Sequence, residues 1–263
     1  MPHVVSTDGT AIAFDRVGDG LPVILVVGAF NDRATGAPLA TFLAQHFTVF
    51  NYDRRGRGAS GDTAPYAVDR EVDDIAALIA EAGGAAAVFG YSSGAILAFE
   101  AAARGLAITR LALYDPPYTV AAGPNQRVDH AAILAEMIAS GRRGDAVEYF
   151  QTQLVGIPEA VVAQIRHAPF RPALEAIAPT LVYDAAIVAG GALPTEVAAT
   201  VTVPTLVVAG GASPFMRAAA HALATAMPNG QARILEDQTH DIDPSVLGPA
   251  LEAFLAPALA NRQ

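Results

Sequence analysis

The chain has 263 residues, 52% of them hydrophobic and 16% charged, which suits one large α/β domain and excludes a globally disordered chain. A formal net charge of −10 argues against a nucleic-acid partner, and the absence of cysteine excludes a disulfide framework and a thiolate metal site. The first residues show no basic segment before an apolar core, and no apolar run is long enough to span a bilayer. We therefore expect a cytoplasmic protein without a membrane partner.

Two short strand patterns flank Asp8-Gly9 at the start of the chain, at residues 4–6 and 11–16, and predict a hairpin. Further runs rich in valine, isoleucine and leucine follow. Their near-continuous apolar character predicts strands of a parallel sheet that is covered on both faces. These runs are residues 23–27, 47–52, 86–89, 108–114 and 205–209, with a weaker one at 232–235. Helical patterns lie between them, as at residues 72–79, so we expect an α/β fold with a doubly wound, mostly parallel sheet.

This rhythm breaks between residues 118 and 203, where the sequence has helical periodicity and several prolines but no clear strand pattern. We expect this segment to be a helical cap inserted between the two parts of the α/β core, residues 1–117 and 204–263. Open α/β sheets bind ligands at the carboxyl ends of their strands. A cap over that edge would shape a pocket and exclude water from it.

The segment Gly90 to Gly94 lies between the strand pattern at 86–89 and an alanine-rich helical pattern that begins at Ala95. Its sequence, Gly-Tyr-Ser-Ser-Gly, matches the G-x-S-x-G pattern of a nucleophile elbow, a sharp turn that exposes a serine between a strand and a helix. Glycine on each side of the serine lets the flanking backbone approach closely. Ser92 is therefore the candidate nucleophile, and we expect the backbone N–H of Ser93 to donate to a developing oxyanion.

Residues 52–60, Tyr-Asp-Arg-Arg-Gly-Arg-Gly-Ala-Ser, are similar to the D-x-R-G-x-G-x-S segment that follows an early strand in many capped α/β-hydrolases. With the elbow, the strand–helix alternation and the insertion, the chain resembles the capped serine-hydrolase branch of the α/β-hydrolase superfamily. The resemblance covers essentially the full length outside the cap. It implies a serine nucleophile, a histidine base, an acid that orients the histidine, and an oxyanion hole of two amides.

His240 is the candidate base, because it follows the last strand pattern and precedes a helix that opens near Asp243-Pro244. This matches the family's C-terminal loop histidine, whose neutral imidazole would accept the Ser92 proton and return it to the leaving group. The alternative is a surface histidine beside Asp241. The other five histidines lie in terminal or helical contexts, and the six show no metal-ligand spacing, so we expect no metal and no cofactor.

The acid is where the sequence departs from the family pattern. The family usually places it just after the penultimate strand, where this chain has Ser213, whose hydroxyl could hold the imidazole tautomer but brings no charge. Some branches of the superfamily carry the acid at the end of the strand after the nucleophile helix, where this chain has Asp115. Asp115 also keeps the order Ser…Asp…His, although an aspartate before two prolines can simply start a turn. Asp115 and Ser213 both remain candidate orienters of His240.

The second oxyanion donor is expected in the loop after the strand at 23–27, which reads Val-Gly-Ala-Phe-Asn from residue 27. Alignment with the family motif indicates the Ala29 N–H as the donor, with that of Phe30 as the near alternative. Related proteins often begin this loop with His-Gly, and the buried histidine stiffens the loop by hydrogen bonding. This chain keeps Gly28 but has Val27 in place of the histidine.

Three arginines lie in the segment 52–60, and they are Arg54, Arg55 and Arg57. They could bind an anionic substrate, but pairing with carboxylates at the edge of the loop is the commoner role and the one we expect. Asp184 lies in the predicted cap, which is not where we expect the group that orients the base.

Together these residues predict a hydrolase that cleaves a small-molecule ester, thioester or lactone through an acyl-enzyme on Ser92. One alternative is a C–C hydrolase or a perhydrolase on the same fold. Another is a non-catalytic ligand-binding homologue. This alternative is slightly favoured by Val27 and Ser213, which stand where related enzymes usually have a histidine and an acid. The expected partner is a small-molecule substrate, and the sequence carries no signal for an oligomeric state.

Overall fold

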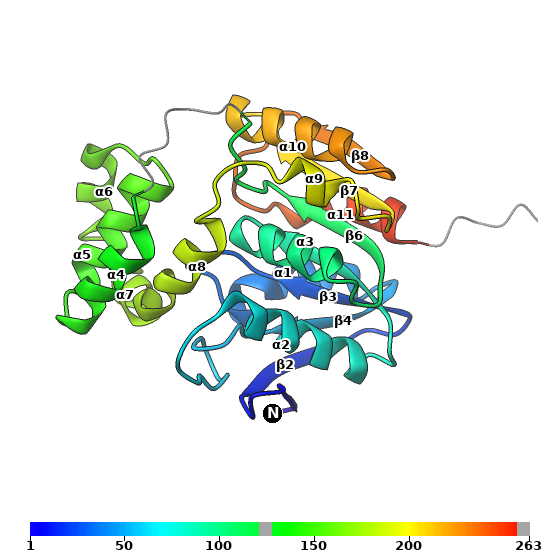
Figure 1. The fold of residues 1–263 in the computed structure, drawn as a ribbon, viewed down its shortest axis with the longest axis horizontal. Helices are drawn as coiled ribbons and strands as arrows, with labels where there is room; N and C mark the ends of the chain where they lie inside the picture. The colour runs from blue at the N-terminus through cyan, green and yellow to red at the C-terminus, as the bar shows by residue number, and fades with distance from the viewer. Residues whose placement is uncertain (121–127, 257–263) are drawn as a thin grey trace, which may run out of the picture.

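The computed structural model describes residues 1–120 and 128–256, which form an α/β unit around one eight-stranded sheet (Figure 1). The strand order across the sheet is β1-β2-β4-β3-β5-β6-β7-β8. The strands are β1 (His3–Val5), β2 (Ala11–Val17), β3 (Leu21–Val26), β4 (Phe47–Tyr52), β5 (Ala86–Tyr91), β6 (Ile108–Tyr114), β7 (Thr205–Gly210) and β8 (Gly230–Leu235). β1 and β2 pair antiparallel to their neighbours, and the strands from β4 to β8 in this order pair in parallel, so the predicted mostly parallel sheet is confirmed.

Helices cover both faces of the sheet, as its apolar strands require. In β3, Ile24 and Val26 pack in the same cluster as α2 (Val68–Glu81), α3 (Ser93–Ala103) and α10 (Pro214–Ala226). The alternate residues Val23 and Leu25 pack on the other face, against α1 (Arg33–Leu43) and α11 (Pro244–Leu255). This two-residue alternation places every buried β3 side chain against a helix.

The chain between β6 and β7 carries a group of helices that we call the helical insert. Its helices are α4 (His130–Ala139), α5 (Arg143–Tyr149), α6 (Glu159–Ile165), α7 (Arg171–Ile177) and α8 (Leu181–Val188), followed by the short helix α9 (Thr195–Ala198) outside it. A π-helical turn (Phe150–Leu154) and a 3₁₀ turn (Ala178–Thr180) join some of them. The insert has an apolar core of its own, which includes Leu134, Val147 and Leu181.

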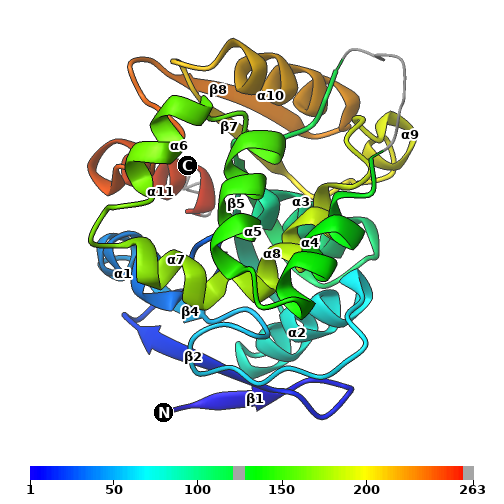
Figure 2. The same ribbon diagram turned by 90° about the vertical axis from the view of Figure 1, so that its left-hand side faces the viewer.

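The helical insert lies over the carboxyl edge of the sheet. Ala29 and Phe30, in the loop after β3, pack against the core of the insert. Figure 2 shows α5 and α8 in front of the central strand β5, which agrees with the placement of the insert beside the sheet in Figure 1. The insert thus covers the edge where open α/β sheets place their ligand sites. No helix in the described part of the chain is both long enough and apolar enough to cross a membrane.

Candidate active site

Ser92 lies at the sharp turn between β5 and α3. Its φ of 57° and ψ of −124° are unusual for a residue with a side chain and match the strained elbow that exposes a nucleophile. Gly94 permits this turn, because a Cβ at that position would overlap the carbonyl oxygens of Val26 and Val27. The turn therefore holds Ser92, a partly exposed residue, at the carboxyl edge of the sheet.

Asp115 and His240 meet beside this turn. Asp115 directly follows β6, the neighbour of β5, and its Oδ2 lies 2.9 Å from Nδ1 of His240. Its Oδ1 accepts a hydrogen bond from the N–H of Gly210 at 3.0 Å, so the carboxylate is fixed to the edge of the sheet. The Asp115 side chain is 1% exposed and that of His240 is 37% exposed. A buried acceptor at Nδ1 favours the tautomer with the proton on Nδ1, which leaves Nε2 free to accept a proton.

Two tyrosines position the loop that carries His240. The hydroxyl of Tyr114 donates to the carbonyl oxygen of Thr239 at 2.6 Å. The ring of Tyr91, the residue before Ser92, lies 5.0 Å from the imidazole ring between centroids. Burial raises the pKa of both phenols, so they remain neutral near the base. The histidine is therefore packed against the strand end that carries the elbow.

Ser213 has a different partner. It is the N-cap residue of α10, and its Oγ accepts a hydrogen bond from the N–H of Met216 at 3.3 Å. The structure thus places Asp115, and not Ser213, against Nδ1 of His240.

The loop after β3 packs closely on the elbow. A Cβ on Gly28 would lie 2.8 Å from both Cβ of Ser92 and the carbonyl oxygen of Tyr91, so only glycine allows this approach. Ser93 is the first residue of α3, and the N–H of such a residue has no partner within its helix. The loop after β3 and the start of α3 therefore both lie beside Ser92, where an oxyanion hole would need its backbone N–H donors.

The two candidate donors of the loop differ in backbone conformation. Phe30 has a φ of 61°, which is uncommon for an aromatic residue, and follows Ala29 in the tight turn. The side chain of Asn31 donates to the carbonyl oxygen of Ala29 at 2.6 Å, so it serves the loop itself. The backbone N–H of Asn31 closes the turn on the carbonyl oxygen of Gly28 at 3.4 Å.

Residues 23–253 match the family model described as the alpha/beta hydrolase family. The chain belongs to the alpha/beta hydrolase family. It is 53% identical to an alpha/beta hydrolase from Sphaerobacter thermophilus DSM 20745, over 97% of this chain and 100% of that one, with a TM-score of 0.91.

Two further solved structures share this fold. An enol-lactonase from Burkholderia xenovorans LB400 is 26% identical, over 97% of this chain and 96% of that one, with a TM-score of 0.64. A thermophilic esterase from Thermogutta terrifontis is 24% identical, over 96% of this chain and 95% of that one, with a TM-score of 0.75.

In this alpha/beta hydrolase the two ends of the segment 52–60 close on each other. Asp53 accepts from the N–H of Ala59 at 2.9 Å with one oxygen and from the N–H of Arg33 at 2.8 Å with the other. Ser60 donates to the carbonyl oxygen of Asp53 at 2.6 Å. Asp53 and Ser60, which occupy the fixed aspartate and serine positions of the motif, therefore hold the shape of the loop through hydrogen bonds.

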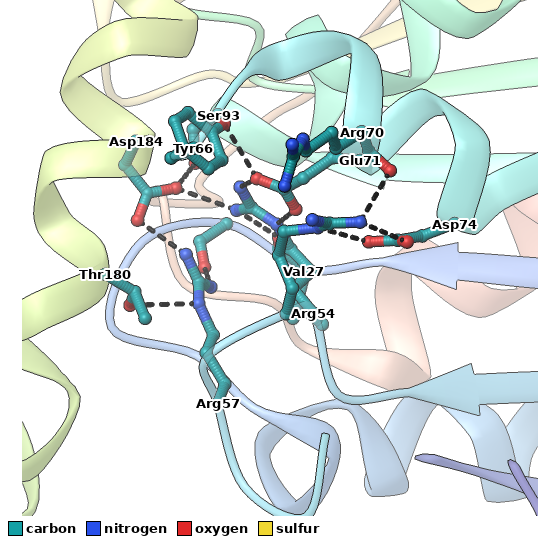
Figure 3. A network of polar contacts seen from close by, with 12 residues as sticks. Val27, Arg54, Arg57, Tyr66, Arg70, Glu71, Asp74, Ser93, Thr180 and Asp184 are labelled. Carbon is teal, nitrogen blue, oxygen red and sulfur yellow. Dashed lines mark hydrogen bonds and ion pairs between the residues drawn. The ribbon is translucent and has the colours of Figure 1, made fainter. Parts of the chain in front are cut away.

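The three arginines of this segment pair with carboxylates, but they do so in the interior and not at the exposed edge of the loop (Figure 3). Arg54, Arg55 and Arg57 are at most 2% exposed. Arg55 forms a two-point contact with Asp74, at 2.7 and 2.8 Å. Arg54 and Arg57 both reach Asp184 of the helical insert, a pairing that the sequence did not predict.

Proposed function

We propose that this protein is a serine hydrolase that cleaves a small-molecule ester, thioester or lactone through an acyl-enzyme on Ser92. The observation that carries the proposal is the 2.9 Å contact between His240 Nδ1 and Asp115 Oδ2 beside the strained turn at Ser92. A serine hydroxyl is a weak nucleophile at neutral pH and needs an adjacent base held in the correct tautomer. The carboxylate of Asp115 supplies that orientation.

Acylation begins when the Ser92 oxygen attacks the carbonyl carbon of the substrate. The hydroxyl proton passes to Nε2 of His240, and Asp115 stabilises the resulting imidazolium through Nδ1–H. The negative charge that develops on the carbonyl oxygen is met by the N–H groups of Ser93 and Ala29. The leaving alkoxide or thiolate then takes the proton from Nε2, and the acyl group stays on Ser92.

Deacylation repeats these steps with water as the nucleophile. His240 removes a proton from the water, the hydroxide attacks the acyl carbon, and the Ser92 oxygen leaves with the proton from Nε2. The helical insert supports these reaction steps because its apolar face limits the access of bulk water to the site. The ring of Phe30, in the loop after β3, meets the ring of Phe150 of the helical insert edge to face, with 5.4 Å between the ring centroids.

The activities named for two of these solved structures involve the same bond type. One is an enol-lactonase and one is an esterase, and both names describe cleavage between an acyl carbon and an oxygen. We extend that reaction class to this chain without assigning a particular acyl group or alcohol.

The decisive experiment measures covalent labelling of Ser92. A fluorophosphonate probe should label the wild type, and p-nitrophenyl esters of short acids should give a burst followed by steady turnover. The variant Ser92→Ala should lose the label, and its turnover should fall by about 10⁴-fold or more. Ser140→Ala removes an exposed serine at the end of α4 and serves as the matched control, which should label like the wild type.

A wild type that takes no label and turns over no activated ester would overturn the proposal, especially if it binds small acids tightly in a manner independent of Ser92. Mass spectrometry of the products separates acyl–oxygen cleavage from cleavage of a C–C bond.

A further inference from the structure

The mechanism above makes no use of Asp184, a carboxylate that is fully buried in α8 of the helical insert. Three donors surround it (Figure 3). Its Oδ1 accepts from Nη1 of Arg54 and from Oγ of Ser93, both at 2.7 Å. Its Oδ2 accepts from Nη2 of Arg57 at 2.6 Å. Such complete pairing lets a charged group remain inside a protein.

Arg57 connects this carboxylate to the loop after β3. Its Nη1 donates to the carbonyl oxygen of Gly28 at 2.6 Å and to that of Asn31 at 2.9 Å. Arg54 adds a longer contact, 3.3 Å, to the carbonyl oxygen of Val27. These three carbonyls lie on both sides of Ala29 in sequence, so the guanidinium groups hold the loop at its two ends.

The contact to Gly28 has a direct consequence for the Ala29 N–H. The carbonyl of Gly28 and the N–H of Ala29 belong to one peptide unit, which is planar, so the two groups point in opposite directions. Fixing the Gly28 oxygen on Arg57 therefore fixes the direction of the Ala29 N–H. A charged donor on the carbonyl also polarises the amide and makes its N–H a stronger hydrogen-bond donor.

Ser93 connects the same carboxylate to the other side of the oxyanion hole. Its N–H is the expected donor from the start of α3, while its side chain, which is 2% exposed, donates to Asp184. One carboxylate thus holds the residue that supplies one oxyanion donor and, through Arg57, the peptide that supplies the other.

The charges in this cluster balance, and that balance keeps Asp184 ionised. Arg54 forms a two-point contact with Glu71, at 2.6 and 2.7 Å, so two arginines face two carboxylates. Burial alone raises the pKa of Asp184, but the charges of Arg57 and Arg54 and the Ser93 hydroxyl together lower it below its ordinary value.

The positions of the arginines separate this cluster from the family motif. In the D-x-R-G-x-G-x-S pattern, Arg55 occupies the fixed arginine position, and it points away from the site to Asp74 and Asp8. Arg54 and Arg57 occupy positions that the pattern leaves open. Many related proteins have a histidine before the glycine that corresponds to Gly28, and its side chain stiffens the loop. Here Val27 has no side-chain donor, and Arg54 and Arg57 stiffen the loop in its place.

We propose that Asp184 is a positioning residue for the oxyanion hole, acting on the Ala29 N–H through Arg57 and on the Ser93 N–H through the Ser93 side chain. This inference rests on the proposed hydrolase function. It also makes the helical insert a structural part of the catalytic centre, since α8 supplies the carboxylate that both arms require.

The test compares Asp184→Asn with Asp74→Asn, because Asp74 is a similarly buried carboxylate whose hydrogen bonds go to Arg55 and not to the two arginines that hold the loop after β3. Four quantities are measured for each variant: kcat and KM with a p-nitrophenyl ester, the affinity for butylboronic acid, and the midpoint of urea unfolding. Boronic acids form a tetrahedral adduct on the nucleophilic serine, so their affinity reports on the oxyanion hole.

We expect Asp184→Asn to lower kcat by about 10- to 100-fold and to weaken boronate binding by a similar factor, with KM changed by about threefold or less. Asp74→Asn should lower the unfolding midpoint but leave kcat and boronate affinity within about twofold of the wild type. Ser93→Ala removes only one hydroxyl and should lower kcat by about three- to tenfold. It decides the question if Asp184→Asn does not fold.

The inference is overturned if Ser93→Ala and Asp184→Asn both fold and both keep the kcat and the boronate affinity of the wild type. So would an equal loss in Asp74→Asn, because that would indicate a general effect of buried charge. Failure of the proposed function has another signature, in which the wild type itself neither turns over esters nor takes the fluorophosphonate label.

Discussion

The two sides of Ser92 are held by different numbers of buried charged side chains. The base side comprises His240 and Asp115, and the oxyanion side comprises the loop after β3 and the start of α3. On the base side, a 2.9 Å contact joins the buried Asp115 to His240, which is 37% exposed, and contacts from Tyr91 and Tyr114 position the loop after β8 that carries the histidine. On the oxyanion side, four charged side chains that are at most 2% exposed form a connected network, and they are Arg54, Arg57, Glu71 and Asp184. In the proposed mechanism the base must gain and lose a proton in every cycle, whereas the amides must hold one geometry while charge appears.

The difference indicates that the oxyanion side of Ser92 is held more rigidly than the base side. An oxyanion hole is effective because its donors are already aimed before the charge develops, so a network that is costly to disturb suits it. A histidine on a half-open loop needs only one well-placed carboxylate to set its tautomer. Substitutions on the two sides should therefore differ in their effects on turnover and on stability.

The largest effect that sharpens this comparison is expected on the base side. Asp115→Asn keeps the shape of the side chain but loses the charge that stabilises the imidazolium, and we expect kcat to fall by about 10³- to 10⁴-fold. The unfolding free energy should change by only about 1 to 2 kcal/mol, because the amide keeps the volume of the buried side chain and its oxygen can still accept from the N–H of Gly210. Steady-state kinetics and urea unfolding measure both quantities, and a loss of kcat below about tenfold would exclude Asp115 as the orienter.

A second prediction concerns the packing of the oxyanion loop. Gly28→Ala would place a Cβ 2.8 Å from Cβ of Ser92, so the loop must shift and kcat should fall by about 100-fold. Gly61→Ala is the matched control, because a Cβ there meets its nearest neighbours at 3.5 Å and needs no shift. Equal kcat in the two variants would mean that the loop does not contribute to turnover.

A third, smaller effect tests the alternative orienter. Ser213→Ala removes the N-cap of α10 and should lower the unfolding free energy by about 1 kcal/mol. It should leave kcat within about twofold of the wild type, since the Ser213 hydroxyl is bonded to Met216. A greater loss of kcat here than in Asp115→Asn would reverse the assignment of the acid.

The smallest expected effect is a pH dependence of the unfolding free energy that arises from Asp184, on the oxyanion side. The pKa of Asp184 is lowered in the folded protein, so its ionised form stabilises the fold at pH values above the unfolded pKa of about 3.9. That contribution is lost as the pH falls through the lower, folded pKa. The difference in unfolding free energy between the wild type and Asp184→Asn should therefore narrow between about pH 6 and about pH 3. A constant difference across urea titrations in this range would contradict the expectation.

The core of the fold could be predicted because local patterns determine it. The continuous apolar runs at 47–52 and 108–114 coincide with β4 and β6, and the helical pattern at 72–79 lies within α2. The expected strand at 86–89 continues to Tyr91, because β5 runs directly into the elbow. The position of Ser92 followed from the same local pattern of glycines.

The site could be predicted only in part, because its partners are distant in the sequence. The sequence spacing left both Asp115 and Ser213 as candidate orienters of His240. In the structure Asp115 lies against His240 because β6 ends beside the loop that carries the histidine. The pairing of Arg57 with Asp184 bridges 127 residues and needs the insert to be docked. One signal was present in the sequence, since Asp184 is the only charged residue in the apolar helix α8.

The contacts of Asp184 also bear on the order in which the protein matures. Arg54 and Ser93 are synthesised 130 and 91 residues before their common carboxylate. Until α8 has emerged and docked, the nascent core holds guanidinium groups that must stay hydrated, and the loop after β3 lacks its anchor. In the proposed mechanism the oxyanion hole is therefore complete only after α8 has docked, although the turn that carries Ser92 is encoded more than 80 residues earlier.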